Sequence, residues 1–86
     1  MGKQVDFNNI DRFTQLGVAI ASLRKMRGMT QEQLAAKSKI SRSLVSAIEA
    51  PGMYSSFKLD VFFNIADALE IDPADLIGMA VLPMEF

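Results

Sequence analysis

Two short helical segments with almost no chain between them lie in the middle of the sequence. Thr30 followed by Gln33 is typical of a capping box, which predicts a helix over about residues 31–38. Ser41 is an N-cap candidate for a second short helix directly after it. Because only residues 39–40 remain between them, the two helices must cross at a steep angle instead of running antiparallel.

Apolar periodicity predicts a longer helix before this pair, ending at Gly28. Its apolar stripe consists of Phe13, Leu16, Ile20 and Leu23. With the stripe facing the core, the side chains expected to face water are Arg12, Gln15, Arg24 and Lys25.

Two further helices are predicted after the pair. An apolar stripe over residues 59–69 predicts a fourth helix, with Phe62 and Phe63 at the centre of the core. Asp72-Pro73 supplies an N-cap and a first helical residue, so a fifth helix should run from there toward Gly78.

No strand signal, internal repeat or linker interrupts this pattern, so the sequence predicts one all-α domain of five helices. We expect an N-terminal arm over residues 1–11, a domain over 12–77 and an apolar C-terminal tail over 78–86. Six of the last eight residues are apolar, although chain ends are usually polar. The tail is expected either to fold over its own first helix or to reach a second subunit.

Composition excludes several classes of function. The chain has no Cys and no His, which removes disulfides, thiol nucleophiles and the commonest metal ligand and general base. We therefore expect no enzymatic activity, no metal and no cofactor. The apolar runs are far shorter than the roughly 20 residues that a membrane-spanning helix needs, and a cytoplasmic location is expected.

The net charge of −1 conceals a strong asymmetry. Residues 1–58 carry nine basic and four acidic side chains, whereas residues 59–86 carry six acidic side chains and no basic one. Six of the basic residues fall within residues 24–42, against Glu32 alone. A local basic face is what contact with nucleic acid requires, although a solvated basic face is an equally good explanation of charge alone.

The sequence over residues 29–49, MTQEQLAAKSKISRSLVSAIE, followed by NIADAL at residues 64–69, resembles the phage repressor and Cro-type helix-turn-helix family, also called the XRE family. The resemblance covers about residues 12–77. It implies a compact lambda-repressor-like domain and a sequence-specific double-stranded DNA-binding transcriptional regulator that occupies its operator as a homodimer. In this family the recognition helix, here about residues 41–49, enters the major groove.

The resemblance also implies the residues that contact DNA. Base contacts are expected from Arg42, Ser43, Ser46 and Ala47. Phosphate contacts are expected from Gln31, Lys37, Lys39, Tyr54, Ser55, Ser56 and Lys58. Arg42 is the strongest base reader because it can pair with guanine through two hydrogen bonds, although a phosphate contact or a solvated side chain is the alternative.

Other residues of the motif are expected to be structural. Leu34, Ala35, Val45 and Ile48 should form core, and Glu49 is interpreted as a structural polar residue. The alternative interpretation of Gln31 is an exposed residue of the first helical turn without a phosphate contact. The alternative for Tyr54 is that its ring covers the edge of the core.

Three positions depart from the family pattern. Lys39 stands where the family commonly has Gly, so we expect a non-glycine residue with a positive φ. Ala47 offers less base-reading chemistry than a longer polar side chain. Leu44 is expected on a partly exposed face.

The alternative function is a protein-interaction module on the same scaffold, such as a toxin-binding antitoxin.

Overall fold

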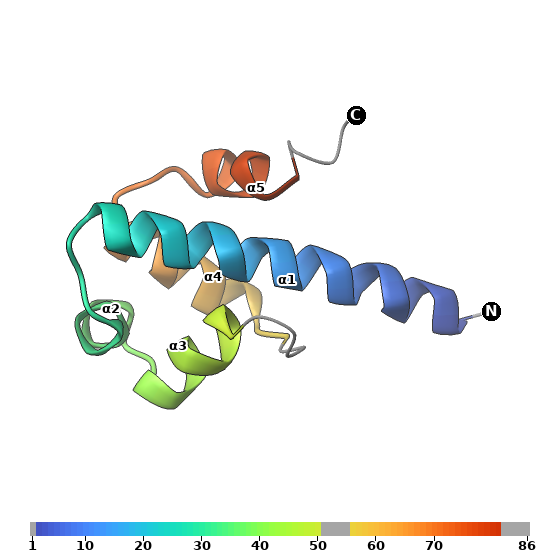
Figure 1. Cartoon of the computed structure of the whole chain (residues 1–86), viewed down its shortest axis with the longest axis horizontal. Helices are drawn as coiled ribbons and strands as arrows, with labels where there is room; N and C mark the ends of the chain where they lie inside the picture. Colours follow the sequence, from blue (N-terminus) through green and yellow to red (C-terminus); the bar gives the residue numbers. More distant parts are fainter. Residues whose placement is uncertain (1, 51–55, 82–86) are drawn as a thin grey trace.

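The computed structural model describes the backbone of residues 2–50 and 56–81 and the side chains of residues 9–50 and 56–80. Within these ranges every regular element is a helix, as the sequence predicted (Figure 1). The helices are α1 (Gly2–Met26), α2 (Gln31–Ser38), α3 (Arg42–Glu49), α4 (Leu59–Ala68) and α5 (Pro73–Val81).

Short-range hydrogen bonds begin three of the helices where the sequence predicted them. The Thr30 hydroxyl accepts from the Gln33 amide at 3.1 Å, and the Gln33 side chain accepts from the Thr30 amide at 2.8 Å, which completes the capping box. Ser41 caps α3 by accepting from the Leu44 amide at 3.0 Å. Asp72 accepts from the Ala74 amide at 2.9 Å at the start of α5. These bonds satisfy N–H groups that have no partner within their own helix.

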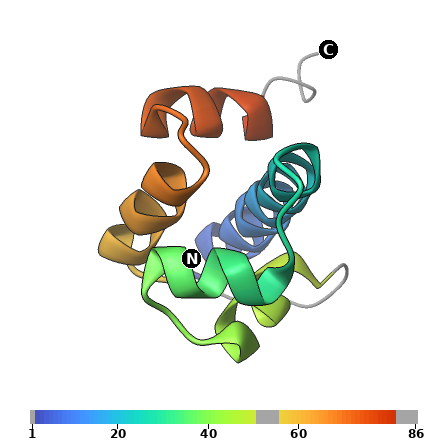
Figure 2. The ribbon, with the colours of Figure 1, turned by 90° about the vertical axis from the view of Figure 1, so that its left-hand side faces the viewer.

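The five helices enclose one core. In Figure 1, α1 lies between α5 on one side and α2 with α3 on the other, and Figure 2 shows α4 beside α2 and α5. Every helix contributes to the core. The most deeply buried apolar side chains are Ile20, Leu34, Val45, Ile65, Leu69 and Leu76.

Phe62 and Phe63 do not share the core. The Phe62 side chain is 4% exposed, whereas Phe63 is 44% exposed, so the prediction for Phe63 was wrong. Consecutive residues on a helix point about 100° apart, and only Phe62 lies on the stripe that continues through Ile65, Ala66 and Leu69.

The first helix begins earlier than its apolar stripe indicates. Residues 2–11, expected to form an arm, are the first turns of α1, which extend beyond the other helices in Figure 1. The apolar stripe marks only a part of this helix: among the described side chains, Leu16, Ile20 and Leu23 pack in or against the core, and the Phe13 ring packs on Phe57.

The fifth helix ends later than predicted. It continues through Gly78 to Val81, and Ala80 is 4% exposed and belongs to the core. A glycine inside a helix costs only about 1 kcal/mol, which the burial of Leu76 and Ala80 on one face offsets. The predicted tail therefore begins within α5, and its residues 82–86 lie outside the described part of the chain.

Candidate nucleic-acid interface

The turn between α2 and α3 has the geometry that the sequence predicted. Lys39 adopts φ 60° and ψ 40°, the left-handed conformation in which glycine is usually found. The Ile40 amide donates to the Ala35 carbonyl at 3.1 Å, which closes the end of α2. Leu34, Ala35, Val45 and Ile48 are all buried, as predicted, and hold the two helices at their crossing angle.

The side of α3 that faces away from the core carries the predicted base-contacting residues. Arg42, Ser43 and Ser46 are exposed, and Ala47 is half-buried. Arg42 is the first residue of α3, so its guanidinium lies at the end that a recognition helix presents to base edges. Leu44 is half-buried against the core, as the sequence indicated.

The N-terminus of α2 is the second part of the candidate interface. Gln31 and Glu32 are its first residues, and within the described part of the chain no acceptor is found for their backbone amides. Free amides at a helix N-terminus favour an anion such as a DNA phosphate. The Gln31 side chain is half-buried instead of fully exposed, because its amide donates to Glu49 Oε1 at 3.0 Å.

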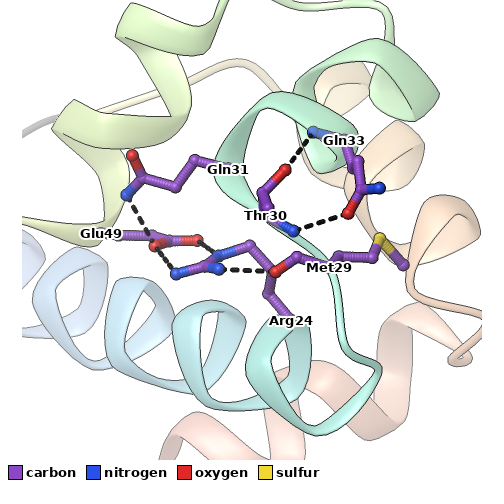
Figure 3. A network of polar contacts seen from close by, with 6 residues as sticks. All are labelled: Arg24, Met29, Thr30, Gln31, Gln33 and Glu49. Atoms are coloured by element: carbon purple, nitrogen blue, oxygen red, sulfur yellow. Dashed lines mark hydrogen bonds and ion pairs between the residues drawn. The ribbon is translucent and has the colours of Figure 1, made fainter.

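Arg24, Glu49 and Gln31 form a polar network at the point where α1, α2 and α3 meet (Figure 3). Arg24 Nε lies 2.8 Å from Glu49 Oε2, and Arg24 Nη2 lies 2.9 Å from Glu49 Oε1. Arg24 Nη1 also donates to the Met29 carbonyl at 2.7 Å, directly before the α2 cap. The hydrogen bond to Glu49 raises the pKa of Arg24 above its ordinary value, against the opposing effect of burial.

This network contradicts the prediction for Arg24 and agrees with the prediction for Glu49. The Arg24 side chain is only 10% exposed, so the prediction that it faces water was wrong. Glu49 is the structural polar residue that the sequence indicated, with a side chain 5% exposed. A bidentate pair between a guanidinium and a carboxylate is geometrically specific, so it fixes the end of α3 relative to α1.

Gly17 provides a second contact between α1 and α3, which sequence reasoning missed. A Cβ atom added at Gly17 would overlap the backbone carbonyl oxygen of Ile48. The two helix backbones can therefore come this close only because residue 17 has no side chain. The signal was available as a lone glycine inside an apolar helical stripe.

The predicted phosphate-contacting residues are spread over the molecule. Lys37 and Lys39 are exposed at the end of α2 opposite to Gln31. Ser56 and Lys58 are exposed before α4. The predictions for Tyr54 and Ser55 lie outside the described residues.

Most exposed acidic side chains of the described residues lie on α4, on α5 or between them, at Asp60, Asp67, Glu70, Asp72 and Asp75. Asp11 and Glu32 are exposed on α1 and α2. Not every cation of the basic segment is free, because Arg24 pairs with Glu49 and Arg27 Nε donates to the Leu69 carbonyl at 2.7 Å. Lys25, Arg27, Lys37, Lys39 and Arg42 are exposed.

Among the side chains that the structure describes, no three carboxylates lie close enough together to hold a metal ion. None of the described helices combines the length and the apolar character needed to cross a membrane.

Comparisons with known proteins agree with this geometry. A helix-turn-helix family model matches residues 20–76. The restriction-modification controller protein C.AhdI from Aeromonas hydrophila is 33% identical with a TM-score of 0.68, over 74% of this chain and 94% of that one. The clp gene regulator ClgR from C. glutamicum is 25% identical with a TM-score of 0.76, over 87% and 95% of the two chains. The wild-type restriction-modification controller protein C.Esp1396I is 27% identical with a TM-score of 0.73, over 83% and 90%.

No curated protein sequence matches the chain. The family match nevertheless spans the capping box, the turn at Lys39, α3 and the start of α5. This chain belongs to the helix-turn-helix family of DNA-binding transcriptional regulators.

Proposed function

We propose that the chain represses or activates transcription by binding a specific duplex operator, with the N-terminal part of α3 in the major groove. The observation that carries this proposal is the position of Arg42, Ser43 and Ser46, which are exposed at one end of α3 while Val45 and Ile48 hold its other face in the core. Arg42 pairs with a guanine, and Ala47 offers at most a methyl contact to thymine.

Phosphate contacts flank this readout in the proposal. The free amides of Gln31 and Glu32 bind one phosphate at the N-terminus of α2. Lys37 and Lys39 provide further contacts, and Tyr54, Ser55, Ser56 and Lys58 contact the phosphates that flank the half-site. In this proposal the chain binds its operator DNA in the cytoplasm.

The chain acts as a homodimer in this proposal. One α3 presents a single strongly discriminating side chain, which gives one half-site little specificity. Leu59 and Ile77 are exposed although both line one apolar pocket between α1, α4 and α5, and Phe63 is exposed nearby on α4. A second copy seated on the α5 part of this surface lies away from α3, because α5 lies on the other side of α1 from α3 (Figure 1).

This choice of surface replaces the predicted tail as the main dimer contact, because Ala80 is buried in its own core. A truncation at Gly78 would remove that core residue. Ile77→Glu is a better probe, and we expect sedimentation equilibrium to show a monomer that no longer prefers two half-sites to one. A variant that stays dimeric would place the interface on residues 82–86 or on the first turns of α1.

Selection from a random duplex pool tests the function itself. We expect enrichment of a motif repeated with two-fold symmetry, with half-sites about one helical turn, roughly 34 Å, apart. If no motif is enriched, the protein-interaction alternative, such as binding of a toxin, replaces the DNA-binding proposal.

A further inference from the structure

We infer that Glu49 is a positioning residue for DNA binding, which acts by holding the Gln31 side-chain amide in one orientation over the phosphate site. This inference rests on the proposed function, because it assigns a role within the same interface. It concerns a residue that does not itself touch DNA.

The chemistry of the contact fixes which end of the Gln31 amide faces Glu49. A carboxylate only accepts hydrogen bonds, so the amide must present its nitrogen, and Gln31 Nε2 lies 3.0 Å from Glu49 Oε1. Figure 3 shows the Gln31 carbonyl oxygen turned away from Glu49. One N–H of the amide is used in this bond and the second is left to donate to a phosphate oxygen.

Glu49 can act in this way because it is itself immobilised. Both of its oxygens accept from Arg24, at 2.8 and 2.9 Å, and its side chain is 5% exposed. Arg24 is held in turn by the Met29 carbonyl at 2.7 Å. The Gln31 amide is thus ordered before DNA arrives, and binding does not have to order it.

Gln31 stands where such an ordered donor is useful. It lines one hollow together with Ser46 and Glu49, and a second hollow together with Thr30 and Arg42. A phosphate over Gln31 therefore lies beside both ends of the proposed base-reading surface. Without Glu49, the Gln31 amide would be free to turn its carbonyl oxygen toward the phosphate. The two carry negative charge and repel each other, so this orientation weakens binding.

A double-mutant cycle on DNA affinity tests the inference, with the duplex obtained from the selection experiment. Gln31→Ala and Glu49→Gln should each weaken binding about tenfold, the loss expected for one hydrogen bond to a charged group. Glu49→Gln keeps one acceptor oxygen, and Arg24, the charged donor, occupies it, so an NH2 group replaces the oxygen that faced Gln31. The double variant should bind no worse than the weaker-binding single variant, because both changes remove the same contact. Asp67→Asn, which makes the same charge change at an exposed position of α4, should bind like the wild type.

Folding is measured by circular dichroism for every variant, and affinities are compared at a temperature where all are folded. If Glu49→Gln does not fold, Glu49→Asp takes its place, because it keeps a carboxylate for Arg24 and withdraws that group from Gln31 by one methylene. Independent losses that multiply to about a hundredfold in the double variant would overturn the inference, as would wild-type affinity in Glu49→Gln. A wild-type chain that selects no duplex would overturn the proposed function and this inference with it.

Discussion

Adding one methyl group at Gly17 tests the contact that fixes α3 against α1. The Cβ of Gly17→Ala would overlap the Ile48 carbonyl oxygen, and an added Cβ at Gly78 would meet nothing within 4 Å. Both glycines lie inside helices, and neither has a left-handed backbone. Gly78→Ala is therefore a matched control that makes the same chemical change without the overlap.

The two substitutions should have opposite effects on the free energy of unfolding. Glycine to alanine in an open helical position stabilises by about 1 kcal/mol, so Gly78→Ala should raise the melting temperature by roughly 5 °C. Overpacking costs about 1–3 kcal/mol, and the upper end applies at Gly17 because the obstacle is backbone. Its propensity gain only partly offsets this cost, which leaves a loss of about 2 kcal/mol and a melting temperature lower by roughly 10 °C.

Thermal and urea unfolding at equal protein concentration, followed by circular dichroism, measures both changes. DNA binding adds a second readout, since an α3 displaced from α1 should lose affinity for the selected duplex more than for a random one. A Gly17→Ala chain as stable as Gly78→Ala would refute the close approach of the α1 and α3 backbones.

The remaining predictions concern four side chains. Phe62→Ala should lower the free energy of unfolding by about 3–5 kcal/mol and Phe63→Ala by less than about 1 kcal/mol, and equal losses in urea unfolding would contradict their different burial. Arg42→Ala should cost about 1–3 kcal/mol of binding and relax preference at one base pair in a repeated selection, whereas an unchanged preference would assign Arg42 to the DNA backbone. Lys39→Gly should stabilise by at most about 1 kcal/mol, because relief of its left-handed conformation is partly offset by the freedom of glycine in the unfolded chain. If Lys39 meets a phosphate, the same variant should lower the slope of log affinity against log salt by about 0.9, and an unchanged slope would remove Lys39 from the interface.

The features predicted correctly from the sequence depend on partners close along the chain. The caps at Thr30, Ser41 and Asp72 each use a backbone amide two or three residues ahead, so the residue types and their spacing are sufficient. The left-handed Lys39 was predicted in another way, from the resemblance, because it stands where the family commonly has glycine. Fold class and the helix-turn-helix unit rest on such local signals.

The predictions that failed depend on which side of a helix meets its neighbours. Apolar periodicity located α1, and the Asp72-Pro73 cap located the start of α5, but neither signal gave the far end of its helix, so the start of α1 at Gly2 and the continuation of α5 past Gly78 were missed. Phe63 was assigned to the core because it is large and adjacent to Phe62. Burial is decided by the crossing of whole helices, which residue type alone does not contain.

The Arg24–Glu49 pair was beyond sequence reasoning for the same physical reason. Its partners lie 25 residues apart on different helices. Arg24 by itself looks like a solvated charge, and Glu49, although interpreted as structural, gives no indication of its partner. Arg27 is similar, since its partner is a backbone carbonyl 42 residues away. Two cations of the basic segment thus hold helices together. Only Arg24 has its charge compensated by a carboxylate, because Arg27 donates to a neutral carbonyl and its side chain is exposed. A count of cations from the sequence therefore includes one charge that is not offered to phosphates, and DNA shape and free amides must contribute in its place.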